Sequence, residues 1–102
     1  MTLRIQRSEQ DEQVAFKLTG RIQAQDILGL LDLVRSELRH RVIVMDLEQV
    51  RLVDRDAVLF LALSEAVGAR LKNCSAYIRE WINQERNAMD RNGTEGPTGF
   101  GE

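Results

Sequence analysis

Ionisable side chains gather where apolar segments of this chain give way to polar ones. Asp46 follows an apolar run, and Asp54, Arg55 and Asp56 directly precede the apolar segment Ala57–Leu63. In an α/β protein, ligands collect beyond strand ends and at helix N-termini, where backbone N–H groups are unpaired. A carboxylate in such a place can cap the helix or imitate a phosphoryl group.

Four carboxylates surround the two expected strand ends. They are Asp46, Glu48, Asp54 and Asp56. Such a cluster can bind Mg²⁺. Because Arg51 and Arg55 are interleaved with the carboxylates, we expect a charge-balanced, solvated rim and no metal site.

Other catalytic chemistry has no support in the residues. His40 is the only histidine and Cys74 the only cysteine. The chain has no Ser-His-Asp set, no phosphate-cradling glycine loop and no zinc-ligand spacing. We therefore expect a protein that is not an enzyme and has no cofactor.

Length and composition indicate one ordinary globular domain. The chain has 102 residues, of which 43% are hydrophobic and 29% charged, with a net charge of −2. That balance predicts no nucleic-acid partner and no attraction to an anionic membrane. The apolar run Ala57–Leu63 is too short to span a bilayer, and we expect no signal peptide and no membrane insertion. A single free thiol fits the reducing cytoplasm.

Hydrophobic periodicity predicts alternating strands and helices. The first half shows a strand pair, Leu3–Gln6 and Gln13–Leu18, joined by the loop Ser8–Glu12 and stopped at Thr19-Gly20. A helical stripe then runs from about Ala24 to Arg39.

The second half continues the alternation. Val42–Met45 is typical of a central strand covered on both faces, and a polar loop is expected after it. A helix is expected from Asp56 or Ala57 to about Val67, with Gly68 just past its end, followed by a short strand within Ala69–Cys74. The last expected helix is capped by Ser75, and its apolar face contains Tyr77, Ile78, Trp81 and Ile82.

The predicted order is β-β-α-β-α-β-α, an α/β fold with a four-stranded mixed sheet and three main helices. Residues 1–86 form the predicted domain. Residues 87–102 contain four of the seven glycines and the only proline, so we expect a flexible Gly-rich tail there.

This order, with Leu18–Ile22 leaving the second strand and Val42–Leu47 followed by Leu52-Val53-Asp54, resembles a STAS domain, the fold of bacterial anti-sigma-factor antagonists. The resemblance covers roughly residues 3 to 86. In that family an Asp-Ser-Ser/Thr-Gly segment opens the second helix, and a hydroxyl there is phosphorylated by an anti-sigma factor kinase. The resemblance implies that phosphorylation releases this partner.

The segment departs from the family pattern. Asp54 matches the family aspartate, Arg55 replaces the first Ser, Asp56 occupies the second hydroxyl position, and Ala57 replaces Gly. Gln23 stands where the family often has Asp. A carboxylate cannot accept phosphate from a serine kinase, so the usual phosphorylation is not expected.

The resemblance and the chain order together predict a partner-binding surface. It comprises Gly20, Arg21, Ile22, Gln23, Asp54, Arg55, Asp56 and Ala57. Asp56 is either a helix N-cap or a fixed charge that imitates the phosphorylated state. Arg55 is either a contact residue or an ordinary solvated charge.

The expected partner is an anti-sigma factor kinase or a related regulator. Two alternatives stay open: a STAS subunit of a membrane lipid or anion transport assembly, and a receiver-like phosphoacceptor that uses Asp46 at the end of Val42–Met45.

Overall fold

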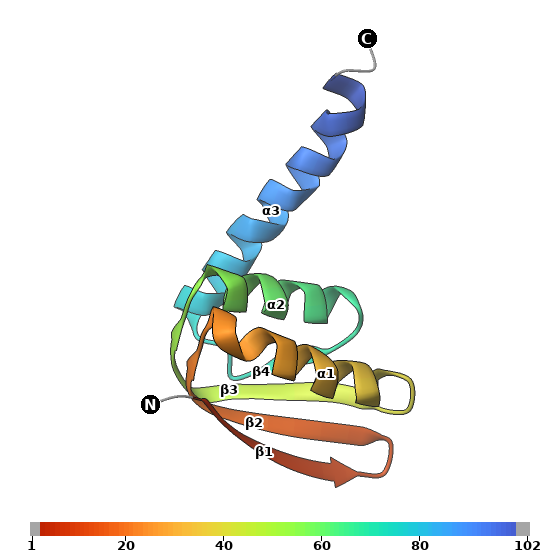
Figure 1. Ribbon diagram of the computed structural model, residues 1–102, viewed down its shortest axis with the longest axis vertical. Helices are drawn as coiled ribbons and strands as arrows, with labels where there is room; N and C mark the ends of the chain where they lie inside the picture. Colours follow the sequence, from red (N-terminus) through yellow and green to blue (C-terminus); the bar gives the residue numbers. More distant parts are fainter. Residues whose placement is uncertain (1–2, 100–102) are drawn as a thin grey trace.

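The computed structural model describes the backbone of residues 3–99 and the side chains of residues 3–89. It contains four strands, three α-helices and one short 3-10 helix (Figure 1). In chain order these are β1 (Leu3–Gln10), β2 (Gln13–Ile22), η1 (Ala24–Asp26), α1 (Ile27–Leu38), β3 (Val42–Val53), α2 (Arg55–Ala66), β4 (Arg70–Lys72) and α3 (Ala76–Gly99). The predicted order β-β-α-β-α-β-α is confirmed.

The strands form one mixed sheet in the order β1-β2-β3-β4. β1 is antiparallel to β2, while β2, β3 and β4 are parallel. The predicted four-stranded mixed sheet is therefore confirmed. Within residues 3–99 the chain does not form the five-stranded parallel sheet that a receiver-like protein requires.

All three helices lie on the same side of the sheet (Figure 1). In β3 the buried residues Ile43, Met45 and Leu47 alternate with more exposed ones, and Val42 is exposed. The prediction that β3 is covered on both faces is therefore wrong. The run of apolar residues at 42–45 hid the alternation, because Val42 and Val44 are apolar residues on the uncovered face.

β2 and β3 are longer than predicted. Thr19 and Gly20 do not end β2, and residues 46–51 are strand instead of a polar loop. Two irregularities in the β2–β3 pairing each give β3 one extra residue, and Gly20 adopts a positive φ of 105° next to one of them. Glycine tolerates this conformation, so the strand bends and continues.

The β1–β2 hairpin is also tighter than predicted. Gln10 pairs with Gln13, so the turn consists of Asp11 and Glu12 alone and the expected loop at 8–12 is mostly strand. Asp11 has a φ of 55°, a left-handed conformation that aspartate accepts more readily than most residues.

The helix ends agree closely with the sequence pattern. α2 begins at Arg55 and Gly68 follows its end with a φ of 111°, as expected for a C′ glycine. Ser75 caps α3 as predicted, because its hydroxyl accepts a hydrogen bond from the Ile78 N–H at 3.2 Å. On the predicted apolar face of α3, Ile78 and Ile82 are buried, whereas Tyr77 is exposed.

α3 is held against α2 at its N-terminal part. Ile78 and Ile82 enter the core, and the Arg79 guanidinium donates two hydrogen bonds, of 2.8 and 2.9 Å, to the Glu65 carboxylate. These bonds hold the pKa of Glu65 below its usual value, against the effect of partial burial. These contacts join the N-terminal part of α3 to α2.

The C-terminal part of α3 extends away from the rest of the domain (Figure 1). The helix continues to Gly99, so the predicted domain boundary at residue 86 falls inside it. Residues 100–102 of the predicted tail lie outside the described residues. The flexibility of residues 87–102 stays a prediction.

The core should be most sensitive to truncation in α2. Leu61 is fully buried, whereas Leu63, two residues away in the same helix, is 54% exposed. We expect Leu61→Ala to lower the free energy of unfolding by about 2–5 kcal/mol. Leu63→Ala should lower it by less than about 1 kcal/mol. Urea unfolding followed by circular dichroism measures both, and equal losses would contradict this core assignment.

Candidate functional site

Asp54 joins the two segments that the sequence assigned to a partner-binding surface. Its Oδ1 accepts a hydrogen bond from the Ala57 N–H at 2.9 Å, and its Oδ2 accepts one from the Ala24 N–H at 2.8 Å. Its own N–H donates to the carbonyl of Ile22 at 3.3 Å. Residues 20–23 and 54–57 therefore meet at one end of the sheet, as the strand order predicted.

Asp54 is also the N-cap of α2, which corrects the interpretation of Asp56 as the helix N-cap. An N-cap has extended backbone and accepts from an N–H two or three residues on, and Asp54 meets both conditions. The strand β3 runs on to Val53, so the first free position after it is residue 54. The residue that caps α2 is therefore Asp54, two residues before the predicted Asp56.

Asp56 lies in the first turn of α2 with an exposed side chain. Its charge favours the positive end of the helix dipole without capping it. The side chain borders a small groove between α1 and α2, with a volume of about 230 Å³. The groove is otherwise lined by Ala24, Ile27, Leu31, Leu59, Phe60 and Leu63. A negative charge therefore stands at the edge of an apolar groove.

Arg55 is paired with α3, a contact that the sequence did not predict. Its Nε and one terminal nitrogen donate to the Glu85 carboxylate at 3.2 and 3.3 Å. Glu85 also accepts a hydrogen bond from the Trp81 indole N–H at 3.1 Å. The Arg55 bond, with a smaller effect from Trp81, holds the pKa of Glu85 below its usual value. The Arg55 side chain is still 69% exposed, so the pair orients it more than it stabilises the fold.

Asp26 is a second residue that the sequence analysis missed. Its carboxylate accepts a hydrogen bond from the Gln23 N–H at 3.0 Å, while its own N–H donates to the Gln23 carbonyl at 2.8 Å. The exchange closes the turn that follows β2 and presents Gln23 beside Asp54. A carboxylate three residues after a polar residue at a helix start is the sequence signal for such a turn.

The four carboxylates at positions 46, 48, 54 and 56 do not form one cluster. β3 is continuous from Val42 to Val53, which places Asp46 and Asp54 roughly 25 Å apart along the strand. Among the described residues no group of three or more potential ligands is placed to hold a metal ion. Every helix within residues 3–99 is too short or too polar to cross a lipid bilayer.

The fold is similar to solved structures of anti-sigma factor antagonists. The antagonist SpoIIAA in its unphosphorylated form superposes with a TM-score of 0.64 at 18% identity, over 86% of this chain and 96% of SpoIIAA. The STAS domain of an anti-sigma factor antagonist from Rhodobacter sphaeroides gives a TM-score of 0.58 at 11% identity, over 71% of this chain and 87% of that domain.

A protein from Shewanella loihica with a SpoIIAA-like fold gives a TM-score of 0.52 at 18% identity, over 86% of this chain and 79% of that protein. No protein-family model matches the sequence. No curated protein matches it significantly either. At these identities the likeness establishes a STAS-like fold, and the function has to be argued from the site.

Replacement of Asp54 and Asp56 should separate their two roles. Asp54→Ala removes the cap of α2 and the acceptor of the Ala24 N–H, so we expect a loss of about 1–2 kcal/mol in unfolding free energy. Asp56→Ala removes only a favourable dipole interaction and should cost less than about 1 kcal/mol. Denaturant unfolding at neutral pH measures both losses. A larger loss for Asp56→Ala would contradict the assignment of the cap.

Proposed function

We propose that this protein is a non-catalytic regulatory domain of the anti-sigma factor antagonist type that binds a protein partner. The proposed contact surface comprises Gly20, Arg21, Gln23, Asp54, Arg55 and Asp56. Two residues of the predicted surface, Ile22 and Ala57, are fully buried, so they support this surface from the core and do not contact a partner. The observation that carries this proposal is the double hydrogen bond of Asp54, which unites a strand-to-helix turn and a helix N-terminus. Exposed polar groups and an apolar groove then stand side by side, as in the mixed surfaces through which proteins associate.

The proposed partner is an anti-sigma factor kinase or a related regulator in the bacterial cytoplasm. The similarity of the whole fold to SpoIIAA supports this choice, since SpoIIAA is an anti-sigma factor antagonist with an unphosphorylated form. If Asp54-Arg55-Asp56-Ala57 corresponds to the family phosphorylation segment, Asp56 stands at its second hydroxyl position.

Asp56 supplies a permanent negative charge at that position. A phosphate group carries about −1.5 to −2 charges and three acceptor oxygens, so one carboxylate is a partial imitation. No residue between Leu52 and Leu63 has a hydroxyl group. The next one, Ser64, is buried and its hydroxyl donates to the Phe60 carbonyl at 2.8 Å. The start of α2 is therefore proposed to signal without phosphorylation.

We expect no phosphate on residues 52–63 after incubation with an anti-sigma factor kinase and ATP. Mass spectrometry of the intact chain and of its peptides measures this. The matched variant Asp56→Ser restores a hydroxyl and should accept one phosphate if the kinase recognises this surface. Phosphate mapped to residues 52–63 of the unmodified protein would contradict the proposal.

Binding to the same kinase should depend on the charge at position 56. If the Asp56 carboxylate imitates a phosphate that releases the kinase, Asp56→Ser and Asp56→Ala should both bind the kinase more tightly. The expected gain in affinity is roughly tenfold, which corresponds to about 1.4 kcal/mol of binding free energy. Titration calorimetry measures the affinities without ATP. Asp32, an exposed carboxylate on α1, provides the control variant Asp32→Ser, which should leave the affinity unchanged. Equal affinities for all four proteins would remove the phosphate-imitating role from Asp56.

A further inference from the structure

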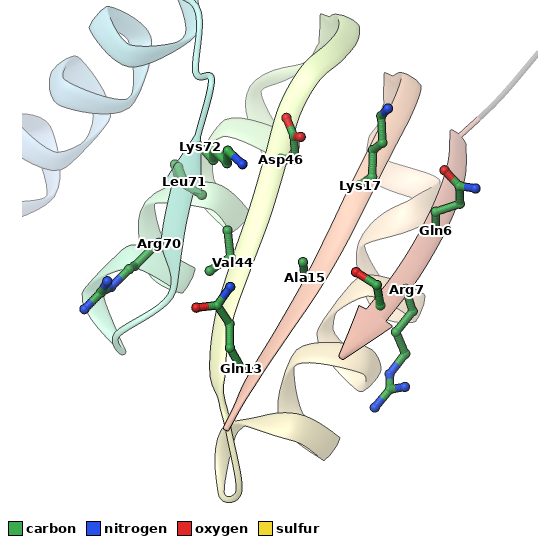
Figure 2. Close-up of a pocket in the computed structure, with 11 residues that line it drawn as sticks. Gln6, Arg7, Gln13, Ala15, Lys17, Val44, Asp46, Arg70, Leu71 and Lys72 are labelled. Atoms are coloured by element: carbon green, nitrogen blue, oxygen red, sulfur yellow. The ribbon is translucent and has the colours of Figure 1, made fainter. Parts of the chain in front are cut away.

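The face of the sheet that carries no helix contains a hollow of about 700 Å³ (Figure 2). Residues from all four strands line it. Its floor is formed by Ala15 of β2 and Val44 of β3, which are direct neighbours in the sheet. Because both side chains are short, the space between the longer surrounding side chains stays open. The volume lies within the range of about 300–1,000 Å³ found for small-molecule sites.

Four cationic residues line this hollow, and the guanidinium of one of them, Arg7, is already paired with Glu9 and Glu37. The other three are Lys17, Arg70 and Lys72. Lys17 and Lys72 lie on either side of Asp46 in one row across β2, β3 and β4, and Arg70 lies in the same row as the floor residues. Neighbouring strands are about 4.8 Å apart, which sets Lys17 and Lys72 about 10 Å apart at the backbone. They are the only two lysines of the chain. Figure 2 shows both beside Asp46, with Arg70 at the β4 edge.

Asp46 does not neutralise these cations by direct contact. Its Oδ1 accepts hydrogen bonds from the Glu48 N–H at 3.0 Å and from the Asn73 side-chain amide at 3.1 Å. Among the side chains of residues 3–89, no carboxylate oxygen lies within 4 Å of a charged nitrogen of Lys17, Arg70 or Lys72.

Other cations of the fold are partly paired: the guanidinium groups of Arg7 and Arg41 both contact Glu37, and that of Arg79 contacts Glu65. Exposed arginines such as Arg35 and Arg39 form no ion pair among the described side chains. The chain as a whole is slightly acidic, with a net charge of −2. The lining of the hollow thus carries a local excess of positive charge in a chain whose net charge is negative.

We propose that this hollow binds a small soluble ligand that carries two or more negative charges of the phosphate type. Lys17, Lys72 and Arg70 donate hydrogen bonds to its oxygens, because ammonium and guanidinium groups form strong charge-assisted bonds with such anions. The compact body of the ligand rests on Ala15 and Val44. This site lies on the sheet face turned away from the helices and does not depend on the proposed protein-binding surface.

Two other occupants fit the hollow less well. A second copy of the chain, placed face to face, would bring three cations opposite the same three cations. A membrane surface would favour exposed apolar side chains around the basic ones, and the residues that surround this floor are mainly polar or charged.

A titration of the full chain followed by ¹⁵N nuclear magnetic resonance tests the proposal. The probes are pyrophosphate and glucose 6-phosphate, with glucose and sodium chloride of matched ionic strength as controls. We expect saturable shifts of the amide signals of Ala15, Lys17, Val44 and Lys72 with both phosphates and with neither control. Shifts confined to other regions, or equal shifts with chloride, would overturn the proposal.

Paired variants separate a built site from general attraction between charges. The double variant Lys17→Gln/Lys72→Gln should weaken pyrophosphate binding at least about tenfold, because hydrogen bonds to charged groups contribute that much or more. Arg35→Gln/Arg39→Gln removes the same charge from exposed positions at the end of α1 and should change the affinity less than about twofold, because exposed charges there are screened by salt.

All four replaced residues are exposed, so both variants should keep the native amide dispersion. Equal weakening in the two variants would reduce the effect to net charge and overturn the proposal. Binding to vesicles of phosphatidylglycerol without binding to pyrophosphate would overturn it in favour of a membrane surface.

Discussion

The carboxylate of Asp54 connects parts of the fold that are distant in the chain. One oxygen caps α2 and the other holds the N–H of Ala24, thirty residues earlier. An N-cap is normally a local device that satisfies one free N–H of its own helix. Here the second oxygen also fixes the turn after β2, so the end of the sheet becomes one surface. The proposed interaction site depends on this connection.

The sheet has two faces with different physical roles. The covered face buries Phe16, Leu18 and Met45 under the helices, and ion pairs with Glu37 and Glu65 stand at its border. The open face has small residues at its centre and cations around them. A solvated face has no packing to satisfy and can therefore carry charges selected for binding. A single domain of this size can then present one surface to a protein and another to a small anion.

The start of α2 is connected to α3 through a chain of side-chain hydrogen bonds. Asp56 stands at the edge of the groove between α1 and α2, and Arg55 is oriented by Glu85 of α3. Glu85 is in turn fixed by the Trp81 indole. A partner that contacts the start of α2 therefore also meets a side chain whose direction α3 controls.

The sequence by itself determined the order of the elements, the mixed sheet and the positions of the helices. The signals for these features are local: the helical and strand periods of apolar residues, the helix-ending Gly68 and the helix-capping Ser75. Each signal involves only a few neighbouring residues. The sequence also placed the two segments of the candidate surface at one end of the sheet, because parallel strands end together. It did not identify the cap of α2, the length of β3 or the pairing of Arg55 with Glu85.

Those features were decided by the tertiary structure. β3 continues to Val53 because the mainly polar residues 48–51 pair with, or bulge against, β2. Asp54 is therefore the first residue after the strand. The row of Lys17, Asp46 and Lys72 likewise exists only through the register of three strands. Strand register depends on contacts between residues far apart in the chain. Local sequence patterns do not specify such contacts. The geometry of both proposed sites is therefore visible only in the tertiary structure.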